Sequence, residues 1–327
     1  MSHGAGAGLT GADFQRGRAS VLINNHNYSR YLSEAIESAL DQTYAPLEVV
    51  VVDDGSTDRS CDVMAAYAGA ITAVMRESSH GQHAAINAAL AASSGEFLFL
   101  LDSDDVFLPA KIEYVVALFE RHSEVGACFH SRDFLTRGGI STGPALELEG
   151  PHDLRDEFRA GRVPFISTTT SAMCFRRRTL DLLVPLPELP AAYFGDHFMK
   201  WGTLAAVPVV FDRRPLSLQR LHDRNLYTRQ RHWREVVQKE SANALWLRRR
   251  IPGAKPFSRR LLVQVVARQL RHAERPRASP DVALYLQEAG RLEAAALLAR
   301  AIIRGLFELA RAVRRRLSAP EPRPLVG

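Results

Sequence analysis

The sequence predicts an α/β protein in which a mainly parallel β-sheet is flanked by helices and followed by a helical, basic C-terminal extension. Short apolar runs alternate with segments of helical spacing through the first two thirds of the 327 residues. Continuous apolar strands are typical of a parallel sheet that is covered on both faces. Polar residues follow three of these runs, and the charge balance reverses near residue 225.

Each element follows from its own local pattern. Apolar residues recur at helical spacing after Ser29, and Pro109 suits the first turn of a later helix. Strands are predicted at residues 20–23, 47–52, 71–75, 97–101 and 125–130. Helices are predicted from about 29 to 40, 58 to 69, 81 to 93 and 109 to 122. An irregular stretch at 131–164 precedes ordered segments at 167–175, 193–204 and 207–211, and the rest reads as helical.

Composition divides the chain into three parts: a Gly- and Ala-rich segment 1–18 that we expect to be disordered, an α/β domain at 19–225, and an Arg-rich helical region at 226–327. Residues 1–225 hold 20 Lys and Arg against 28 Asp and Glu, whereas residues 226–327 hold 22 against 8. Three widely spaced cysteines fit a reducing compartment. We find no signal-peptide pattern and expect a cytoplasmic protein, soluble or peripheral to a membrane.

Polar sequences stand at the ends of three predicted strands: 24–27 (Asn-Asn-His-Asn), 53–56 (Asp-Asp-Gly-Ser) and 102–105 (Asp-Ser-Asp-Asp). Ligands of open parallel sheets bind beyond the carboxyl ends of the strands, so we expect one shared site. Clustered carboxylates suit Mg²⁺ or Mn²⁺ together with nucleotide phosphates. A solvated turn is the alternative interpretation of the acidic cluster taken alone.

In order and spacing, these motifs resemble family 2 glycosyltransferases of the GT-A fold. The resemblance extends from about Val21 to Asn225. It rests on residues 21–27, 38–44, 48–58, 81–87, 95–97, 102–105, 109, 195–196 and 220–225.

The resemblance implies a nucleotide-sugar site that we expect to be completed by Mn²⁺ or Mg²⁺. Asn24, His26 and Asp54 would line the base pocket, where His26 departs from the aromatic residue, often Tyr, that is commoner in the family. A hydrogen-bonded histidine at a strand end is the alternative for His26. Asp102 would contact ribose or metal.

The resemblance also implies the residues around the diphosphate. Asp104 would be the principal metal ligand, and His222 would complete the metal site or touch the diphosphate. Arg220 would supply a fixed cation near the same oxygens. Asp105 is expected to cap the following turn. A surface histidine in a polar loop is the alternative interpretation of His222.

Asp196 is the candidate general base. In an inverting transfer, a carboxylate must take the proton of the acceptor hydroxyl as that hydroxyl attacks the anomeric carbon. Because Asp196 also stands at the start of a predicted helix, an N-cap that binds free backbone amides is the alternative.

The expected function is transfer of a sugar from a nucleoside diphosphate sugar, with UDP preferred, to an acceptor hydroxyl in cell-surface polysaccharide, glycolipid or glycoconjugate synthesis. Two other classes remain open: a nucleotidyltransferase, and a non-catalytic adaptor that kept the fold. The first strand is followed by neither glycines nor a lysine, which disfavours the phosphate loop of a nucleotidyltransferase.

The basic tail carries a separate hypothesis. An apolar stripe runs through residues 292–317, with arginines on a different face. Such a helix can lie on an anionic bilayer beside a lipid-linked or glycan acceptor. The alternatives are packing on the α/β domain and packing on a second copy in a homo-oligomer. We expect no nucleic-acid partner, because no basic platform with interleaved aromatics is visible.

Overall fold

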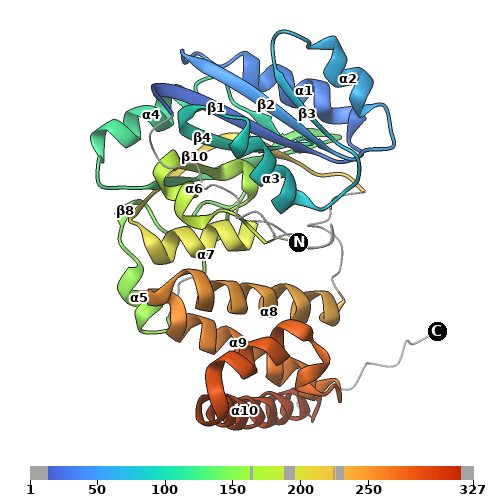
Figure 1. Ribbon diagram of the computed structural model, residues 1–327, viewed down its shortest axis with the longest axis vertical. Coiled ribbons are helices and arrows are strands. Elements are labelled where there is room, and N and C mark those ends of the chain that lie inside the picture. The colour runs from blue at the N-terminus through green and yellow to red at the C-terminus, as the bar shows by residue number, and fades with distance from the viewer. Residues whose placement is uncertain (1–13, 163–164, 188–195, 224, 226–231, 318–327) are drawn as a thin grey trace, which may run out of the picture. The chain divides into compact units, whose positions relative to one another are not determined.

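The computed structural model describes residues 14–162, 165–187, 196–223, 225 and 232–317 (Figure 1). The chain divides into two compact units, Met1–Gln230 and Arg231–Gly327. The division falls five residues beyond the boundary that composition predicts.

The strands of the first unit form one ten-stranded mixed sheet. Its central order is β3-β2-β1-β4-β9-β6-β10-β5, with β7 beside β6 and β8 beside β10. The pairs among β3, β2, β1 and β4 are parallel, as is the pair of β6 and β10. The strands are β1 (Gln15–Asn25), β2 (Leu47–Asp54), β3 (Thr72–Arg76), β4 (Gly95–Asp102), β5 (Val106–Phe107), β6 (Ala127–Thr136), β7 (Gly139–Ser141), β8 (Gly150–His152), β9 (Met173–Arg176) and β10 (Val209–Arg220).

Helices cover both faces of this sheet, as the continuous apolar strands predict. Alternate residues of β1 and β4 share a core with α1 and α4, whereas α3 lies against the other face (Figure 1). The helices of this unit are α1 (Ser29–Leu40), α2 (Ser60–Ala66), α3 (Gln82–Ala91), α4 (Lys111–Arg121), α5 (Arg155–Arg159), α6 (Arg177–Leu183) and α7 (Asp196–Ala206). The α/β architecture expected from the sequence is confirmed.

The first strand begins at Gln15, within the segment 1–18 for which we expected disorder. Residues 15–18 are held in place by distant partners. The Gln15 amide donates to the Ser94 carbonyl at 2.7 Å, the Gly17 amide donates to Glu96 at 2.9 Å, and Arg18 pairs with Glu48 at 3.2 Å. A local pattern gives no sign of such contacts.

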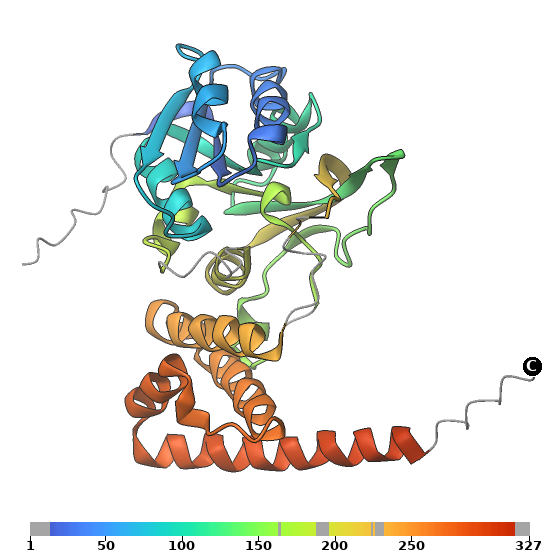
Figure 2. The ribbon, with the colours of Figure 1, turned by 90° about the vertical axis from the view of Figure 1, so that its right-hand side faces the viewer.

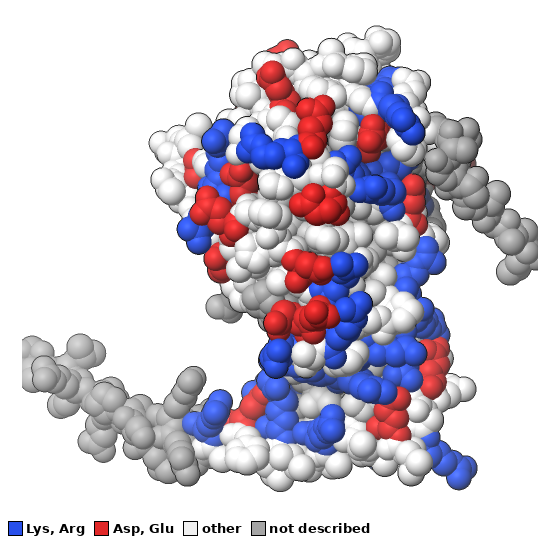
Figure 3. All heavy atoms as spheres, turned by 90° about the vertical axis from the view of Figure 1, so that its left-hand side faces the viewer, with Lys and Arg blue, Asp and Glu red and all other residues white. Residues whose placement is uncertain are grey.

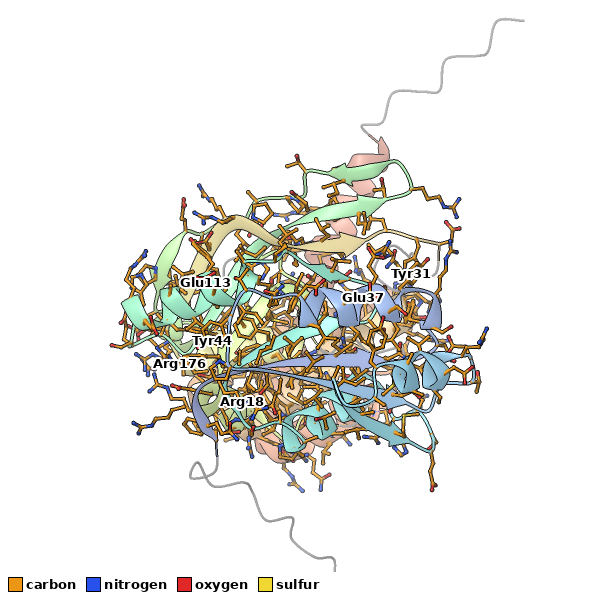
Figure 4. All side chains as sticks on the ribbon, turned by 90° about the horizontal axis from the view of Figure 1, so that it is seen from above. Arg18, Tyr31, Glu37, Tyr44, Glu113 and Arg176 are labelled. Atoms are coloured by element: carbon orange, nitrogen blue, oxygen red, sulfur yellow. The ribbon has the colours of Figure 1, made fainter. Side chains whose placement is uncertain are left out.

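Different residues lie at the two ends of the parallel strands. Arg18, Tyr44 and Arg176 lie at the end where β1 and β4 begin, and Tyr31 of α1 lies at the opposite end (Figure 4). Glu48 binds the Ser20 hydroxyl and the Ser94 amide at the first of these ends, which fixes the strand starts. The other end is therefore the one that carries the polar motifs.

Register places those motifs side by side. Asn24 of β1 stands opposite Asp102 of β4, and Asn25 stands opposite Asp53 of β2. Because the three strands are parallel, their polar ends meet at one edge of the sheet, as the sequence predicts.

The second unit is helical and contains α8 (Trp233–Arg250), α9 (Lys255–Arg271) and α10 (Pro280–Leu317). Gly290 interrupts α10 with φ 76°, so the segment after it is a helix of its own. Among the described residues, no helix is both long enough and apolar enough to span a bilayer.

One carboxylate ties the three helices together. Glu293 of α10 accepts from Arg259 of α9 at 2.7 Å and from Arg248 of α8 at 2.8 Å. The hydrogen bond from Arg259, joined by that from Arg248, lowers the pKa of Glu293 to about 2.

We predict that Glu293→Gln lowers the unfolding free energy of the helical unit at pH 7 by about 1 kcal/mol, a value reduced for solvent screening. The lowered pKa means that this stabilisation is present above pH ~4.5 and is lost as the pH falls toward 2. Urea unfolding of the full chain, followed by circular dichroism at pH 7 and pH 3, measures it.

Glu288→Gln is the matched control, because Glu288 forms a more exposed pair with Arg249 alone. It should change the unfolding free energy by less than ~0.5 kcal/mol. Equal effects of the two substitutions at pH 7 would contradict the role given to Glu293.

Candidate active site

A hydrogen-bonded group forms where β1, β4 and α3 meet. The Asp102 carboxylate accepts from the Asn24 amide at 2.9 Å and from the Gln82 amide at 2.7 Å. The backbone amide of Asp102 donates to the Ser171 hydroxyl at 3.0 Å. Asp102 is therefore held in one orientation, with Asn24 beside it as the sequence predicts.

The neighbouring acid Asp53 is a structural residue. It is buried, and its carboxylate accepts from the Asn25 amide at 2.7 Å and from the Ser56 hydroxyl and amide at 2.6 and 2.9 Å. These bonds close the turn after β2 onto the end of β1.

His26 has a fixed ring plane. Its Nδ1 lies 2.8 Å from the Asp54 carbonyl oxygen, which can only accept, so this nitrogen carries the proton. Nε2 then accepts from the Asn27 amide at 3.0 Å. Asn27 has φ 61°, a left-handed conformation that asparagine tolerates. The His26 ring is therefore oriented at both nitrogens.

Asp54 is almost fully buried, at 2% exposure, and its carboxylate already has several donors. The backbone amides of His80 and Gly81 donate to it at 3.0 and 2.8 Å, and Arg76 lies 3.1 Å away. Asp54 thus anchors the segment before α3 to the end of β2. A contact with a nucleotide base stays a prediction and would require this carboxylate to share its donors.

Asp104 meets the end of the sheet's last long strand. Its Oδ2 lies 3.0 Å from His222 Nε2 and 3.2 Å from Asn225 Nδ2. The His222 ring stacks on Tyr31 with centroids 4.8 Å apart, and Tyr28 meets its edge. The structure thus brings Asp104 and His222 together across 118 positions of the sequence.

Arg220 is fixed beside this pair. Its Nε donates to the Asp104 carbonyl at 2.9 Å, its guanidinium binds Glu34 at 2.5 Å, and it lies over the Tyr31 ring, 4.9 Å from the centroid. The guanidinium is a rigid cation, and Glu34 partly offsets its charge.

Asp105 differs from its expected role as a cap of the turn that follows it. It is buried and accepts from the backbone amide of Arg220 at 2.9 Å, which joins the acidic turn to β10. Burial, with repulsion from Asp104, raises the pKa of Asp105 to about 7. Lys111 is also buried, and desolvation lowers its pKa to about 8. Asp105 and Lys111 are thus two buried, interacting polar groups beside the acidic turn at residues 102–105.

Asp196 is the first residue of α7, but its side chain and residue 195 lie outside the described part of the chain. Its role as base or cap therefore stays a prediction.

Asp104 and His222 fit a divalent cation in donor chemistry. A carboxylate oxygen and an imidazole nitrogen face each other at 3.0 Å. The carboxylate suits Mn²⁺ or Mg²⁺ in a site that leaves positions for phosphate oxygens, and the imidazole is a ligand that transition metals accept more readily than Mg²⁺ does. Over the part of the chain that the structure describes, no group of three or more His, Cys, Asp or Glu side chains forms a metal site. The remaining ligands would have to come from the substrate.

Three residues of the site escaped prediction. Tyr31 counts in the sequence as one of the apolar residues at helical spacing, Glu34 reads as an ordinary surface position, and Gln82 lies inside a motif without an assigned role. Only Gln82 had a usable signal, as a polar residue at the first turn of a helix that follows a strand end.

The model of the family described as "Glycosyl transferase family 2" matches residues 20–179, which include Asn24, His26, Asp54, Asp102 and Asp104. Residues 20–179 of this chain form a domain of glycosyl transferase family 2. The resemblance in the motifs is thereby confirmed.

Curated relatives support the family assignment. An uncharacterized glycosyltransferase of Nostoc sp. is 32% identical over 214 residues, which are 64% of this chain and 66% of that protein. Glycosyltransferase GlyG of Streptococcus pneumoniae is 35% identical over 97 residues, 29% of this chain and 32% of that protein. The chain thus spans less than two thirds of the length of these relatives.

Solved structures share the fold. TarS of S. aureus, residues 1–349 in complex with UDP-GlcNAc, is 17% identical with a TM-score of 0.59, covering 87% of this chain and 79% of that one. The mannosyltransferase PcManGT of Pyrobaculum calidifontis, in complex with GDP-Man and Mn²⁺, is 22% identical with a TM-score of 0.52, covering 92% and 84%. The family 2 chain therefore has the GT-A type of α/β fold that we expected.

Gly55 allows the segment before α3 to approach the turn after β2 closely. Its φ is 68°, and a Cβ there would lie 2.6 Å from the Ser78 carbonyl carbon. Gly69 has φ 86° with no atom within 4 Å of such a Cβ. Both glycines have a positive φ that would strain a residue with a side chain. Only at Gly55 would an added Cβ also clash with neighbouring atoms.

We predict that Gly69→Ala costs about 1–2 kcal/mol of unfolding free energy, from strain alone. Gly55→Ala should cost roughly twice as much or more, because the Ser78–Gly81 segment must also move away from Asp54. Urea unfolding of the two variants measures the difference. Equal losses would show that the close approach adds nothing.

Proposed function

We propose that this family 2 chain transfers a sugar from a nucleoside diphosphate sugar, with UDP favoured as the nucleotide, to an acceptor hydroxyl with inversion at the anomeric carbon. The observation that carries the proposal is the convergence of the Asn24–Gln82–Asp102 group and the Asp104–His222 pair at one edge of the sheet. Open α/β sheets bind their ligands at this edge. Structures of the same fold are known with UDP-GlcNAc and with GDP-Man.

His26 would stack on the base. Its ring is held at both nitrogens, so little side-chain entropy is lost when a base packs against it. Asn24 and Asp54 would line the base pocket with His26, and Asp102 would contact the ribose or the metal. The preference for UDP is an expectation that the donor panel tests.

Mn²⁺ or Mg²⁺ would be held by Asp104 and His222. When bound, the cation would offset the negative charge that builds on the departing nucleoside diphosphate. Tyr31 keeps the His222 ring in place, and Asn225 donates to Asp104, so both donors are oriented before substrate arrives. Arg220 would add a fixed positive charge on the same side.

Asp196 would accept the proton of the acceptor hydroxyl. It begins α7, and the positive end of a helix dipole favours the ionised carboxylate, which is the form that takes a proton. The acceptor would be a glycan or a lipid-linked saccharide used in cell-surface polysaccharide, glycolipid or glycoconjugate synthesis.

We predict that the purified chain releases nucleoside diphosphate slowly from at least one member of a panel of UDP- and GDP-sugars when Mn²⁺ or Mg²⁺ is present. Asp104→Ala should lower this rate by about 100-fold or more, because the chief metal ligand is lost. Asp62→Ala, at an exposed position of α2, is the matched control and should keep the full rate.

Full activity of Asp104→Ala would overturn the metal assignment. If no member of the panel reacts or binds in calorimetry, a non-catalytic adaptor becomes the better interpretation. Release of pyrophosphate from a nucleoside triphosphate would instead indicate a nucleotidyltransferase.

Asp196→Asn separates catalysis from helix capping, because asparagine caps as well as aspartate but takes up no proton at neutral pH. We predict a fall in kcat of about 10²–10⁴-fold, with the thermal midpoint unchanged and the KM for the donor little altered. Product NMR should show an inverted anomeric configuration. An unchanged kcat would assign Asp196 to the cap.

A further inference from the structure

The segment of α10 after Gly290 has its acidic residues on the packed side. Glu293 pairs with Arg248 and Arg259, and Glu308 pairs with Arg304 at 2.9 Å and Arg271 at 3.4 Å. Leu297 and Ala301 are buried on the same side. These two glutamates are the only acids between residues 291 and 317, so both are already neutralised within the chain.

The opposite side of this segment is apolar and exposed. The described part of the chain has eleven exposed large hydrophobic residues, and five of them lie between residues 292 and 307. They therefore form a patch rather than scattered surface residues. We call this face the apolar strip of α10. Its large members are Leu292, Ile302, Ile303, Leu306 and Phe307, exposed by 91, 51, 54, 62 and 69%.

Small residues complete the strip. Ala295, Ala296, Ala299 and Ala310 are exposed and occupy the same side at helical spacing. The exposed side of this helix is therefore apolar, whereas its packed side combines ion pairs with the buried Leu297 and Ala301. Within its unit, the last part of α10 runs on past α8 and α9 (Figure 2).

The exposed charged residues on the borders of the strip are arginines. Glu293 shares the direction of Arg311, but it is only partly exposed and pairs with Arg248 and Arg259. At 100° per residue, exposed Arg291 stands on one edge of the strip, and exposed Arg300 and Arg311 stand on the other. Three further arginines follow at positions 314–316 of the sequence. Figure 3 shows Lys and Arg side chains gathered over the visible face of the helical unit.

We propose that the apolar strip of α10 binds an anionic lipid surface. The helix would lie in the plane of the interface, with Leu306 and Phe307 among the acyl chains and the bordering arginines on headgroup phosphates. The proposal does not depend on the catalytic function. It would place a glycosyltransferase beside a lipid-linked acceptor.

Charge favours lipid over a second copy of the chain. In a symmetric pair of strips, the bordering arginines of one copy would lie near those of the other, and the segment has no unpaired acid to oppose them. An anionic bilayer supplies the opposite charge along both edges. An anionic bilayer therefore matches both the apolar strip and the arginines on its borders.

The test is co-sedimentation of the full chain with vesicles. We expect binding to vesicles of phosphatidylcholine with 30–40% phosphatidylglycerol, at roughly tenfold or higher affinity than to phosphatidylcholine alone, and weakened at high salt. Leu306→Asp with Phe307→Asp should lower the affinity at least about tenfold. Ile140→Asp, at an exposed apolar position of the other unit, is the matched control and should bind normally.

A second variant, Arg300→Glu with Arg311→Glu, should abolish the preference for anionic lipid, while circular dichroism shows that both double variants remain folded. Failure of the wild type to bind anionic vesicles at low salt would overturn the proposal. So would a dimer in light scattering that is lost in Leu306→Asp with Phe307→Asp while vesicle binding is unchanged, since the strip would then serve a second copy.

Discussion

The parallel register of β1 between β2 and β4 is the constraint on which the candidate site depends. It sets Asn25 beside Asp53 and Asn24 beside Asp102, so each buried or half-buried carboxylate meets a donor amide from the neighbouring strand. A shift of one residue would turn every side chain to the other face of the sheet. The donors would then be lost and the acids left without partners, which is costly in a buried edge.

A second link joins the first helix to the last strand. Tyr31 and Glu34 of α1 hold His222 and Arg220, which lie almost two hundred residues later in the chain. The Asp105 carboxylate accepts a hydrogen bond from the backbone amide of Arg220. The acidic turn and the end of β10 are thus held by the same packing that forms the core, and the ligands that we propose for a cation are oriented before it binds.

In the helical unit, ion pairs join the helices to one another. Its ion pairs lie between α8, α9 and α10, where Glu293 and Glu308 neutralise arginines of the neighbouring helices. Because the acids are used inside, the outward face of α10 is left with alanines, large apolar side chains and arginines. The same arrangement that ties the three helices together therefore creates the surface to which we assign a lipid partner.

Apart from β5, the strands and helices from residue 20 to 130 follow from the sequence, as do the shared edge of polar residues and the family, because apolar periodicity and strand-end motifs are local signals. The short strands β5, β7, β8 and β9 do not, since their formation depends on pairing with distant strands. The short helices α5 and α6 do not either, since they pack on α7. The sequence likewise marked an apolar stripe on the last helix. Only the tertiary structure decided which way that stripe faces and which side chains meet Asp104, because packing between distant segments determines burial and contact.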